Sequence, residues 1–157
     1  VIWCRTPRWG RFEYWRDPIR TRDAWHTDDD GTEWCSVGDL GRLEDGFLHL
    51  DGRRTDLIIT GGVNVYPLEI EQVLRHDDRI ADVAVFGIED PDWGQAVCAA
   101  VVANPASRLT VADLELLATR QVAPYKRPKR WLIVEAIPTS STGKVQRHRL
   151  GGLLGRR

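Results

Sequence analysis

The sequence contains no methionine, and its 157 residues begin with valine. We therefore expect the chain to be a piece of a longer protein. The sequence also lacks the run of about 18 to 20 apolar residues that a membrane helix requires. Its first residues do not follow the charged, apolar and small-residue order of a signal peptide. These absences predict a cytoplasmic protein with no membrane span.

Metal-ligating residues are few and scattered. The cysteines are odd in number and form no CxxC pair, so neither a disulfide framework nor a zinc site is predicted. The histidines share no metal-ligand spacing, and we assign them no role. These residues are Cys4, Cys35, Cys98, His26, His49, His76 and His148.

An excess of charge of one sign is also missing. The formal net charge is -1, with 42% hydrophobic and 29% charged residues, which is typical of a globular protein. Residues 1–33 are rich in Trp and Arg, a combination that also occurs on nucleic-acid surfaces. Acidic residues such as Glu13, Asp17 and Asp23 interrupt this basic field, so an irregular, partly packed segment without nucleic-acid binding is favoured.

Local patterns divide the rest of the chain into short elements. Residues 34–53 predict two strands around the Glu44-Asp45-Gly46 turn. Two β-rich runs then flank Gly61-Gly62, and Pro67 is expected at the start of a helix. The buried stripe of that helix is predicted to hold Leu68, Val73 and Leu74, with Ile70 at its flank.

Strongly apolar runs predict the core. Residues 81–88 and 95–103 are expected to be core strands, and 130–137 another. Thr110 and Asp113 match a capping box before a helix of about ten residues. A last helix is expected over residues 145–154.

The resulting fold class is α+β, with two domains. Residues 52–157 are expected to form a small three-stranded-type central sheet flanked by helices. Residues 1–51 are expected to form a β-rich remnant of a different, larger domain.

Several motifs point to one enzyme family. They occur in the order SVGDLG, DGRRTDLIITGGVNVYPLEIE, DPDWGQ, YKRPKR and PTSSTGKVQR. Together they resemble the adenylate-forming acyl-CoA synthetases, which include fatty-acid, aromatic-acid and bile-acid CoA ligases. In that family a large N-terminal domain holds the phosphate loop and the acid pocket, and the C-terminal domain is a mobile lid. The resemblance implies that this chain is the lid plus the end of the large domain, and that it is inactive alone.

The resemblance implies a two-step reaction. A carboxylic acid and ATP give an acyl-adenylate and pyrophosphate, and coenzyme A then takes the acyl group, leaving AMP. Lys144 in PTSSTGK would stabilise charge in the first step, and Gly143 would let the backbone approach closely. Asp39 and Arg53 would bind the nucleotide, and Thr55 would be the hinge. Mg²⁺ would arrive with ATP.

The second step would use a different set of residues. Gly61 and Gly62 would leave room for the pantetheine arm, with Trp93 beside it. The basic loop 125–130 would face the CoA phosphates. The predicted CoA-binding residues are Gly61, Gly62, Trp93, Tyr125, Arg127 and Lys129.

Simpler interpretations of these residues stay open. Asp39 could be a turn residue, Trp93 a packing residue, and the basic loop a solvated surface. The Lys144 turn does not match the GxxxxGK[ST] phosphate loop, and Ser141 to Lys144 spells SxxK without the SDN or KTG partner of a serine acyl-enzyme. Alternative functions are an adenylation domain that loads a carrier protein and a CoA-binding or partner-binding module without catalysis.

The resemblance also implies regulation by a lysine acetyltransferase. Acetylation of Lys144 would remove the charge that the first step needs. Mass spectra of the cellular protein in which Lys144 is always unmodified would contradict this hypothesis.

Overall fold

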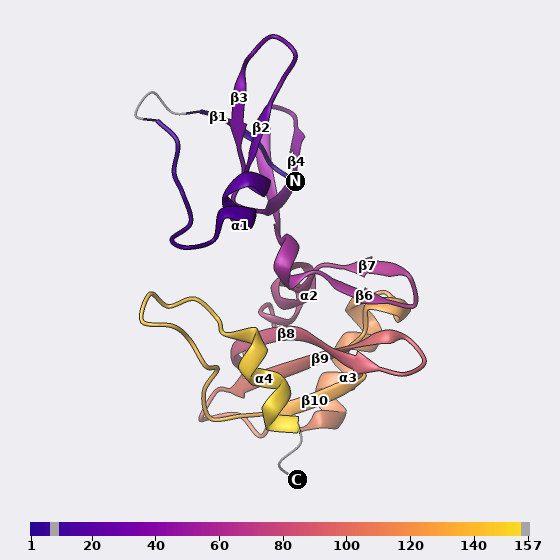
Figure 1. Cartoon of the computed structure of the whole chain (residues 1–157). Coiled ribbons are helices and arrows are strands. Elements are labelled where there is room, and N and C mark those ends of the chain that lie inside the picture. The colour runs from indigo at the N-terminus through magenta and orange to yellow at the C-terminus, as the bar shows by residue number, and fades with distance from the viewer. Residues whose placement is uncertain (7–9, 155–157) are drawn as a thin grey trace. The chain divides into compact units, whose positions relative to one another are not determined.

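The computed structural model describes residues 1–6 and 10–154. The chain forms two compact units, Val1–Thr55 and Asp56–Arg157 (Figure 1). The division thus follows Thr55, whereas the sequence predicted it between residues 51 and 52. The short helix η1 (Arg54–Asp56) spans this point.

The first unit is rich in β-structure, as predicted, but its beginning is more regular than expected. Strands β1 (Cys4–Arg5), β3 (Glu33–Cys35) and β2 (Trp25–Thr27) form a three-stranded antiparallel sheet. Helix α1 (Pro18–Asp23) begins where the carboxylate of Asp17 accepts a 2.9 Å hydrogen bond from the backbone of Arg20. The expectation of an irregular, partly packed 1–33 segment was therefore correct only in part, and residues 7–9 lie outside the described part. These strands are short and show no sequence periodicity, but β3 pairs with β1 on one side and with β2 on the other.

The predicted hairpin of the first unit is confirmed. Strand β4 (Asp39–Glu44) pairs with β5 (Phe47–Arg53) in antiparallel register. Asp45 and Gly46 have φ values of 52° and 79°, so both central turn residues are left-handed, as a two-residue hairpin with native twist requires. Residues 34 and 35, which were predicted to begin this hairpin, belong to β3 instead.

The second unit has a five-stranded sheet instead of the predicted three-stranded one. Its strands run in the order β10-β9-β6-β7, and β8 also pairs with β9. The bounds are β6 (Ile58–Thr60), β7 (Val63–Val65), β8 (Ile80–Asp90), β9 (Gly94–Ala103) and β10 (Arg130–Ile133). The extra strands are the two runs beside Gly61-Gly62, which form a hairpin joined to β9 through the pair Thr60 and Gly94.

Both faces of this sheet are buried, which explains its apolar runs. Helices α2 (Pro67–Leu74) and α3 (Val111–Gln121) pack in one apolar cluster with Val85 and Val101. Helix α4 (Arg147–Leu154) packs in the other, where Leu150 lies with Phe86 (Figure 1). Strand β10 ends before residue 137, the predicted limit, and Ile137 packs in the second cluster.

Helix α2 begins at Pro67, as predicted, but its buried stripe is rotated from the predicted one. Ile70 and Leu74 are fully buried, while Leu68 and Val73 are only partly buried. Besides Pro67, Ile70 and Leu74, the charged side chain of Glu71 is also buried on α2. The prediction placed only apolar residues on this stripe and therefore missed the charge.

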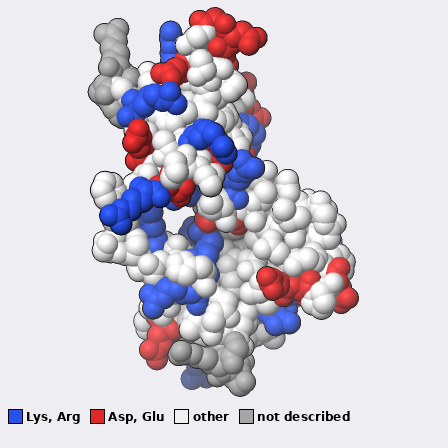
Figure 2. Space-filling view, viewed as in Figure 1, with Lys and Arg blue, Asp and Glu red and all other residues white. Residues whose placement is uncertain are grey.

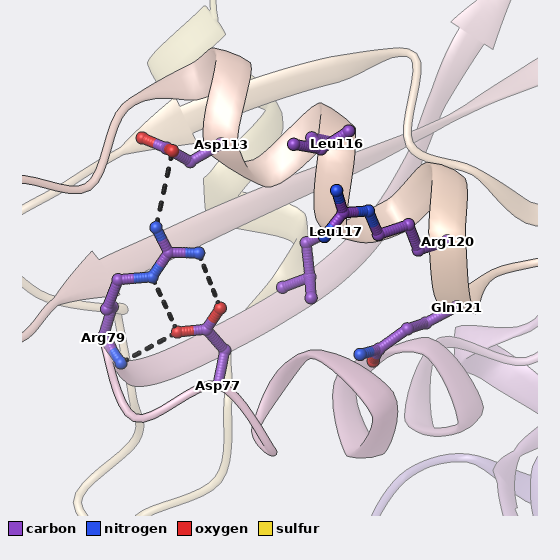
Figure 3. A pocket seen from close by; sticks show the side chains of 7 residues that line it. All are labelled: Asp77, Arg79, Asp113, Leu116, Leu117, Arg120 and Gln121. Carbon is purple, nitrogen blue, oxygen red and sulfur yellow. Dashed lines mark hydrogen bonds and ion pairs between the residues drawn. The ribbon is translucent and has the colours of Figure 1, made fainter.

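The capping box of α3 is confirmed, and an ion-pair cluster extends it. Thr110 accepts from the backbone of Asp113, whose carboxylate accepts from the backbone of Thr110. Arg79 lies 3.4 Å from the Asp113 carboxylate and 2.7 Å from that of Asp77. Figure 3 shows these side chains on one side of a pocket of about 300 Å³, with Arg120 on α3 at the other. The charges of Asp77, Arg79 and Asp113 are thus satisfied by one another.

This cluster predicts that the free energy of unfolding depends on pH. The hydrogen bond from Arg79 holds the pKa of Asp77 below its ordinary value, against the opposing effect of burial. Because the folded state has the lower pKa, the carboxylate contributes stability above about pH 4, and that contribution is lost as the pH falls through the folded pKa. We expect Asp77→Asn to lower the free energy of unfolding by about 1 kcal/mol at pH 7 and by much less at pH 2. Urea unfolding at the two pH values measures this.

The neighbouring Asp78 provides the control, because its side chain is exposed. Asp78→Asn should leave the pH dependence of unfolding unchanged. An Asp77→Asn effect that is equal at both pH values would contradict the ion-pair explanation.

Candidate functional site

Lys144 stands at the end of a well-defined turn. Thr139 and Val145 form an isolated antiparallel bridge, and the backbone N–H of Ser140 donates to the carbonyl of Lys144 over 2.8 Å. The N–H of Gly143 donates back to the carbonyl of Ser140 over 2.9 Å. Gly143 has φ of 78°, a left-handed value that favours glycine here. The turn is therefore closed by its own hydrogen bonds.

The Lys144 side chain is exposed. Its backbone N–H donates to the hydroxyl of Ser140 over 3.1 Å, but within residues 1–6 and 10–154 no carboxylate forms an ion pair with its ammonium. An unpaired ammonium on a closed turn can stabilise an anion that is brought to it.

The structure brings the predicted CoA residues Gly61, Trp93 and Lys129 together. The N–H of Gly61 donates to the carbonyl of Trp93 over 2.9 Å, and a Cβ added to Gly61 would lie 2.8 Å from the Trp93 ring. The Lys129 ammonium lies 3.7 Å from the centre of the same ring. Trp93 itself is half exposed. These side chains form one surface, which we call the Trp93 platform.

The two glycines have different surroundings. Both have positive φ, 56° for Gly61 and 77° for Gly62. The space where Gly61 lacks a Cβ is taken by Trp93, whereas no atom lies within 4 Å of a Cβ built on Gly62. The open space predicted for both residues therefore lies beside Gly62.

The remaining basic residues of loop 125–130 are partly engaged. The Lys126 ammonium lies 2.7 Å from Oε2 of Glu69, near the start of α2. Partial burial lowers the pKa of Lys126, but its hydrogen bond and the charge of Glu69 outweigh this effect and raise it overall. The exposed ring of Tyr125 lies beside the same ammonium, in the short helix η2 (Pro124–Lys126).

Arg127 holds the end of α3. Its Nε donates to the carbonyl of Val122 over 2.8 Å, and its Nη2 donates to the carbonyl of Thr119 over 2.9 Å. These carbonyls lack helical partners, so the cation satisfies them and complements the helix dipole. The sequence prediction assigned Arg127 to the CoA phosphates and did not foresee this contact.

In the first unit, the two predicted nucleotide residues are neighbours. Asp39 and Arg53 are directly opposite on β4 and β5, and Nε of Arg53 lies 3.3 Å from the Asp39 carboxylate. Both side chains are partly exposed. A carboxylate held in this way can accept hydrogen bonds from two adjacent hydroxyls.

One buried ion pair was missed by sequence reasoning. Nη2 of Arg147 donates to Oε1 of Glu71 over 2.7 Å, and Nη1 donates to Asp56 over 2.9 Å. The Glu71 side chain is only 4% exposed. In the sequence, Glu71 lies beside Ile70 at the edge of the apolar stripe of α2. This position could have indicated that Glu71 is buried and needs a cation.

Three further features of the described residues concern metal ions, membranes and surface charge. Within 1–6 and 10–154, no group of three or more His, Cys, Asp or Glu side chains is arranged to hold a metal ion. No helix of that part has the length and apolar content needed to cross a membrane. Figure 2 shows both acidic and basic side chains on the visible face of each unit.

Comparison with known proteins decides the family. Residues 69–144 match the model described as the AMP-binding enzyme C-terminal domain. The long-chain-fatty-acid–CoA ligase FadD13 of Mycobacterium tuberculosis is 42% identical over 134 residues, which cover 85% of this chain and 25% of that ligase. The chain belongs to the AMP-binding enzyme C-terminal domain family of the adenylate-forming acyl-CoA ligases.

Solved structures of this family agree with the fold. ATP-bound MatB from Rhodopseudomonas palustris is 35% identical with a TM-score of 0.79, and the match covers 91% of this chain and 28% of that one. The o-succinylbenzoate CoA synthetase MenE from Bacillus subtilis, in complex with its acyl-adenylate intermediate, is 34% identical with a TM-score of 0.70, and the match covers 79% of this chain and 25% of that one. This AMP-binding C-terminal domain chain thus spans about a quarter of the length of its relatives.

Proposed function

We propose that this chain is the C-terminal part of an ATP-dependent acid–CoA ligase. The parent enzyme would convert a carboxylic acid and ATP to an acyl-adenylate and pyrophosphate, and then transfer the acyl group to CoA. The names of FadD13 as a CoA ligase and of MenE in complex with an acyl-adenylate support both steps. The unit Asp56–Arg157 would be the mobile lid on a large N-terminal domain, with Thr55 as the hinge.

The observation that carries the proposal is the exposed ammonium of Lys144 at the end of its closed turn. In the first step a carboxylate attacks a negatively charged phosphorus, so a cation is needed between the two. Lys144 would supply it, and Asp39 and Arg53 would hold the ribose of the nucleotide. Mg²⁺ would enter with ATP.

The second step would use the Trp93 platform. The pantetheine arm would pass beside Gly62, where the structure leaves open space. Trp93 would line its path, while Lys129 and the exposed ring of Tyr125 would face the nucleotide part of CoA. Arg127 would contribute through the charge that remains accessible beside the end of α3.

The activity can be tested on the natural full-length protein. We expect acid-dependent pyrophosphate release from ATP, followed by a CoA thioester, in a panel that includes long-chain fatty acids, succinylbenzoate, aromatic acids and bile acids. The first two are chosen because the names of FadD13 and MenE refer to them, and neither name refers to a bile acid. This chain alone is the negative control.

The alternatives predict different products. Thioester formation on a phosphopantetheinyl carrier protein but not on CoA would indicate an adenylation domain. CoA binding without pyrophosphate release for any acid would indicate a module without catalysis, and would contradict the ligase.

A further inference from the structure

Arg147 ties together parts of the second unit that are far apart in the sequence. Besides the bonds from its Nη atoms to Glu71 and Asp56, its Nε donates to the carbonyl of Val85 on β8 over 3.0 Å. Oε1 of Glu71 also accepts a 2.8 Å bond from the N–H of Val85. The guanidinium therefore joins the first turn of α4 to α2, to strand β8 and to the beginning of the unit.

This cluster is directly connected to the Lys144 turn. Arg147 is the first residue of α4 and follows Lys144 by two intervening residues. Both of these are held, since Val145 pairs with Thr139 and the N–H of Gln146 donates to the carbonyl of Pro138 over 2.8 Å. The short connection leaves little freedom for the turn to move independently of α4.

The energetics favour one geometry for this cluster. Glu71 is almost completely buried, and a buried carboxylate that loses its cation leaves an uncompensated charge. An arginine fork makes several bonds in fixed planar directions, whereas the lysine ammonium is a compact point charge without that fork. The start of α4 is therefore held at a fixed position and angle on the sheet.

We propose that Arg147 is a positioning residue for Lys144. Anchored on Glu71, Val85 and Asp56, it fixes the point from which the Lys144 turn leaves the domain. Because Asp56 is the first residue of this unit and follows the proposed hinge, a rotation of the unit carries the lysine with it. Arg147 acts through Lys144 and does not itself contact the substrate. The inference rests on the proposed role of Lys144 in the first step.

The expected effect is selective for the first step. In the full-length protein, Arg147→Ala should slow single-turnover pyrophosphate release by about 100-fold, because a displacement of about 1 Å at a reacting group has an effect of that size. Arg147→Lys, which keeps the charge but loses the fork, should slow pyrophosphate release by about 10-fold. This variant can still be measured if Arg147→Ala does not fold. Neither variant should change the KM for ATP or the rate of thioester formation from a presynthesised adenylate by more than about threefold.

A double-mutant cycle shows whether Arg147 acts through Lys144. In a Lys144→Ala background, the Arg147 substitutions should slow the first step by no more than about twofold further. The matched control is Arg75→Ala, because Arg75 lies 3.9 Å from the same Glu71 carboxylate but belongs to the end of α2. It should not slow the first step selectively.

Two results would overturn the proposal while leaving the ligase assignment intact. One is a double variant whose first-step rate falls by the product of the two single-variant reductions, those of the Arg147 substitution and of Lys144→Ala. The other is an equal loss of both steps that follows the loss of folded protein in a thermal melt. If Lys144→Ala itself leaves pyrophosphate release unchanged, the role of Lys144 fails, and the positioning role fails with it.

Discussion

Lys144→Ala in the full-length protein is expected to slow acyl-adenylate formation by about 100- to 1,000-fold, a typical cost of removing one charge-stabilising group. The ammonium has no carboxylate partner among the described residues, so its loss leaves no buried charge and should not affect folding. Thioester formation from a presynthesised adenylate should stay within about threefold of the wild type, because that step begins after the phosphorus chemistry. Pyrophosphate release and thioester formation, each measured in a single turnover, give the two rates.

Two further variants make this result specific. Lys144→Arg keeps the positive charge with a different shape and should recover part of the lost rate. Arg120→Ala removes an exposed cation from α3 and should leave both steps unchanged. If both steps persist unchanged in Lys144→Ala, the lysine is an ordinary surface residue, and its proposed role in the first step is wrong.

Gly61→Ala is expected to have a large effect on the other step, thioester formation. A Cβ on Gly61 would lie 2.8 Å from Trp93, so the ring must move and carry its contact with Lys129 away. The left-handed backbone adds a strain of about 1 to 2 kcal/mol for any residue with a Cβ. We expect the transfer to CoA to slow by about 10-fold or more, with pyrophosphate release retained.

Gly31→Ala separates strain from contact. Gly31 has φ of 81°, and no atom lies within 4 Å of a Cβ built there, so this variant suffers the same backbone strain without displacing a ring. It should lower the melting temperature and leave both chemical steps unchanged. Trp93→Ala should reproduce the loss of CoA transfer with no strain at Gly61. Equal rates of CoA transfer in Gly61→Ala, Trp93→Ala and the wild type would remove the Trp93 platform from the thiolation step.

Several features of the fold could be predicted because they depend on residues close together in the sequence. Thr110 and Asp113 are three positions apart, and they form the capping box that their types indicate. Asp45 and Gly46 form the hairpin turn for the same local reason. Pro67 begins α2 because its fixed φ suits the first helical position.

Features that depend on distant partners could not be predicted. Arg127 donates hydrogen bonds to carbonyls at the end of α3 and does not simply extend into solvent. No neighbouring residue in the sequence indicates this contact. The three-stranded sheet was an underestimate because the pairing of Thr60 with Gly94 joins the β6–β7 hairpin to β9 from more than thirty positions away in the printed sequence. These contacts depend on which backbone N–H and C=O groups still lack a hydrogen-bond partner once the core has packed.

The sequence by itself determined the family, because the motifs and their order are properties of the chain, and it contains the charged residues that we propose for the site. The tertiary structure alone decided how these residues are arranged. It placed the ring of Trp93 against Gly61 and left the open space beside Gly62. It also buried Glu71, whose charge then required the cation of Arg147 from 76 positions away and so fixed the helix that follows Lys144.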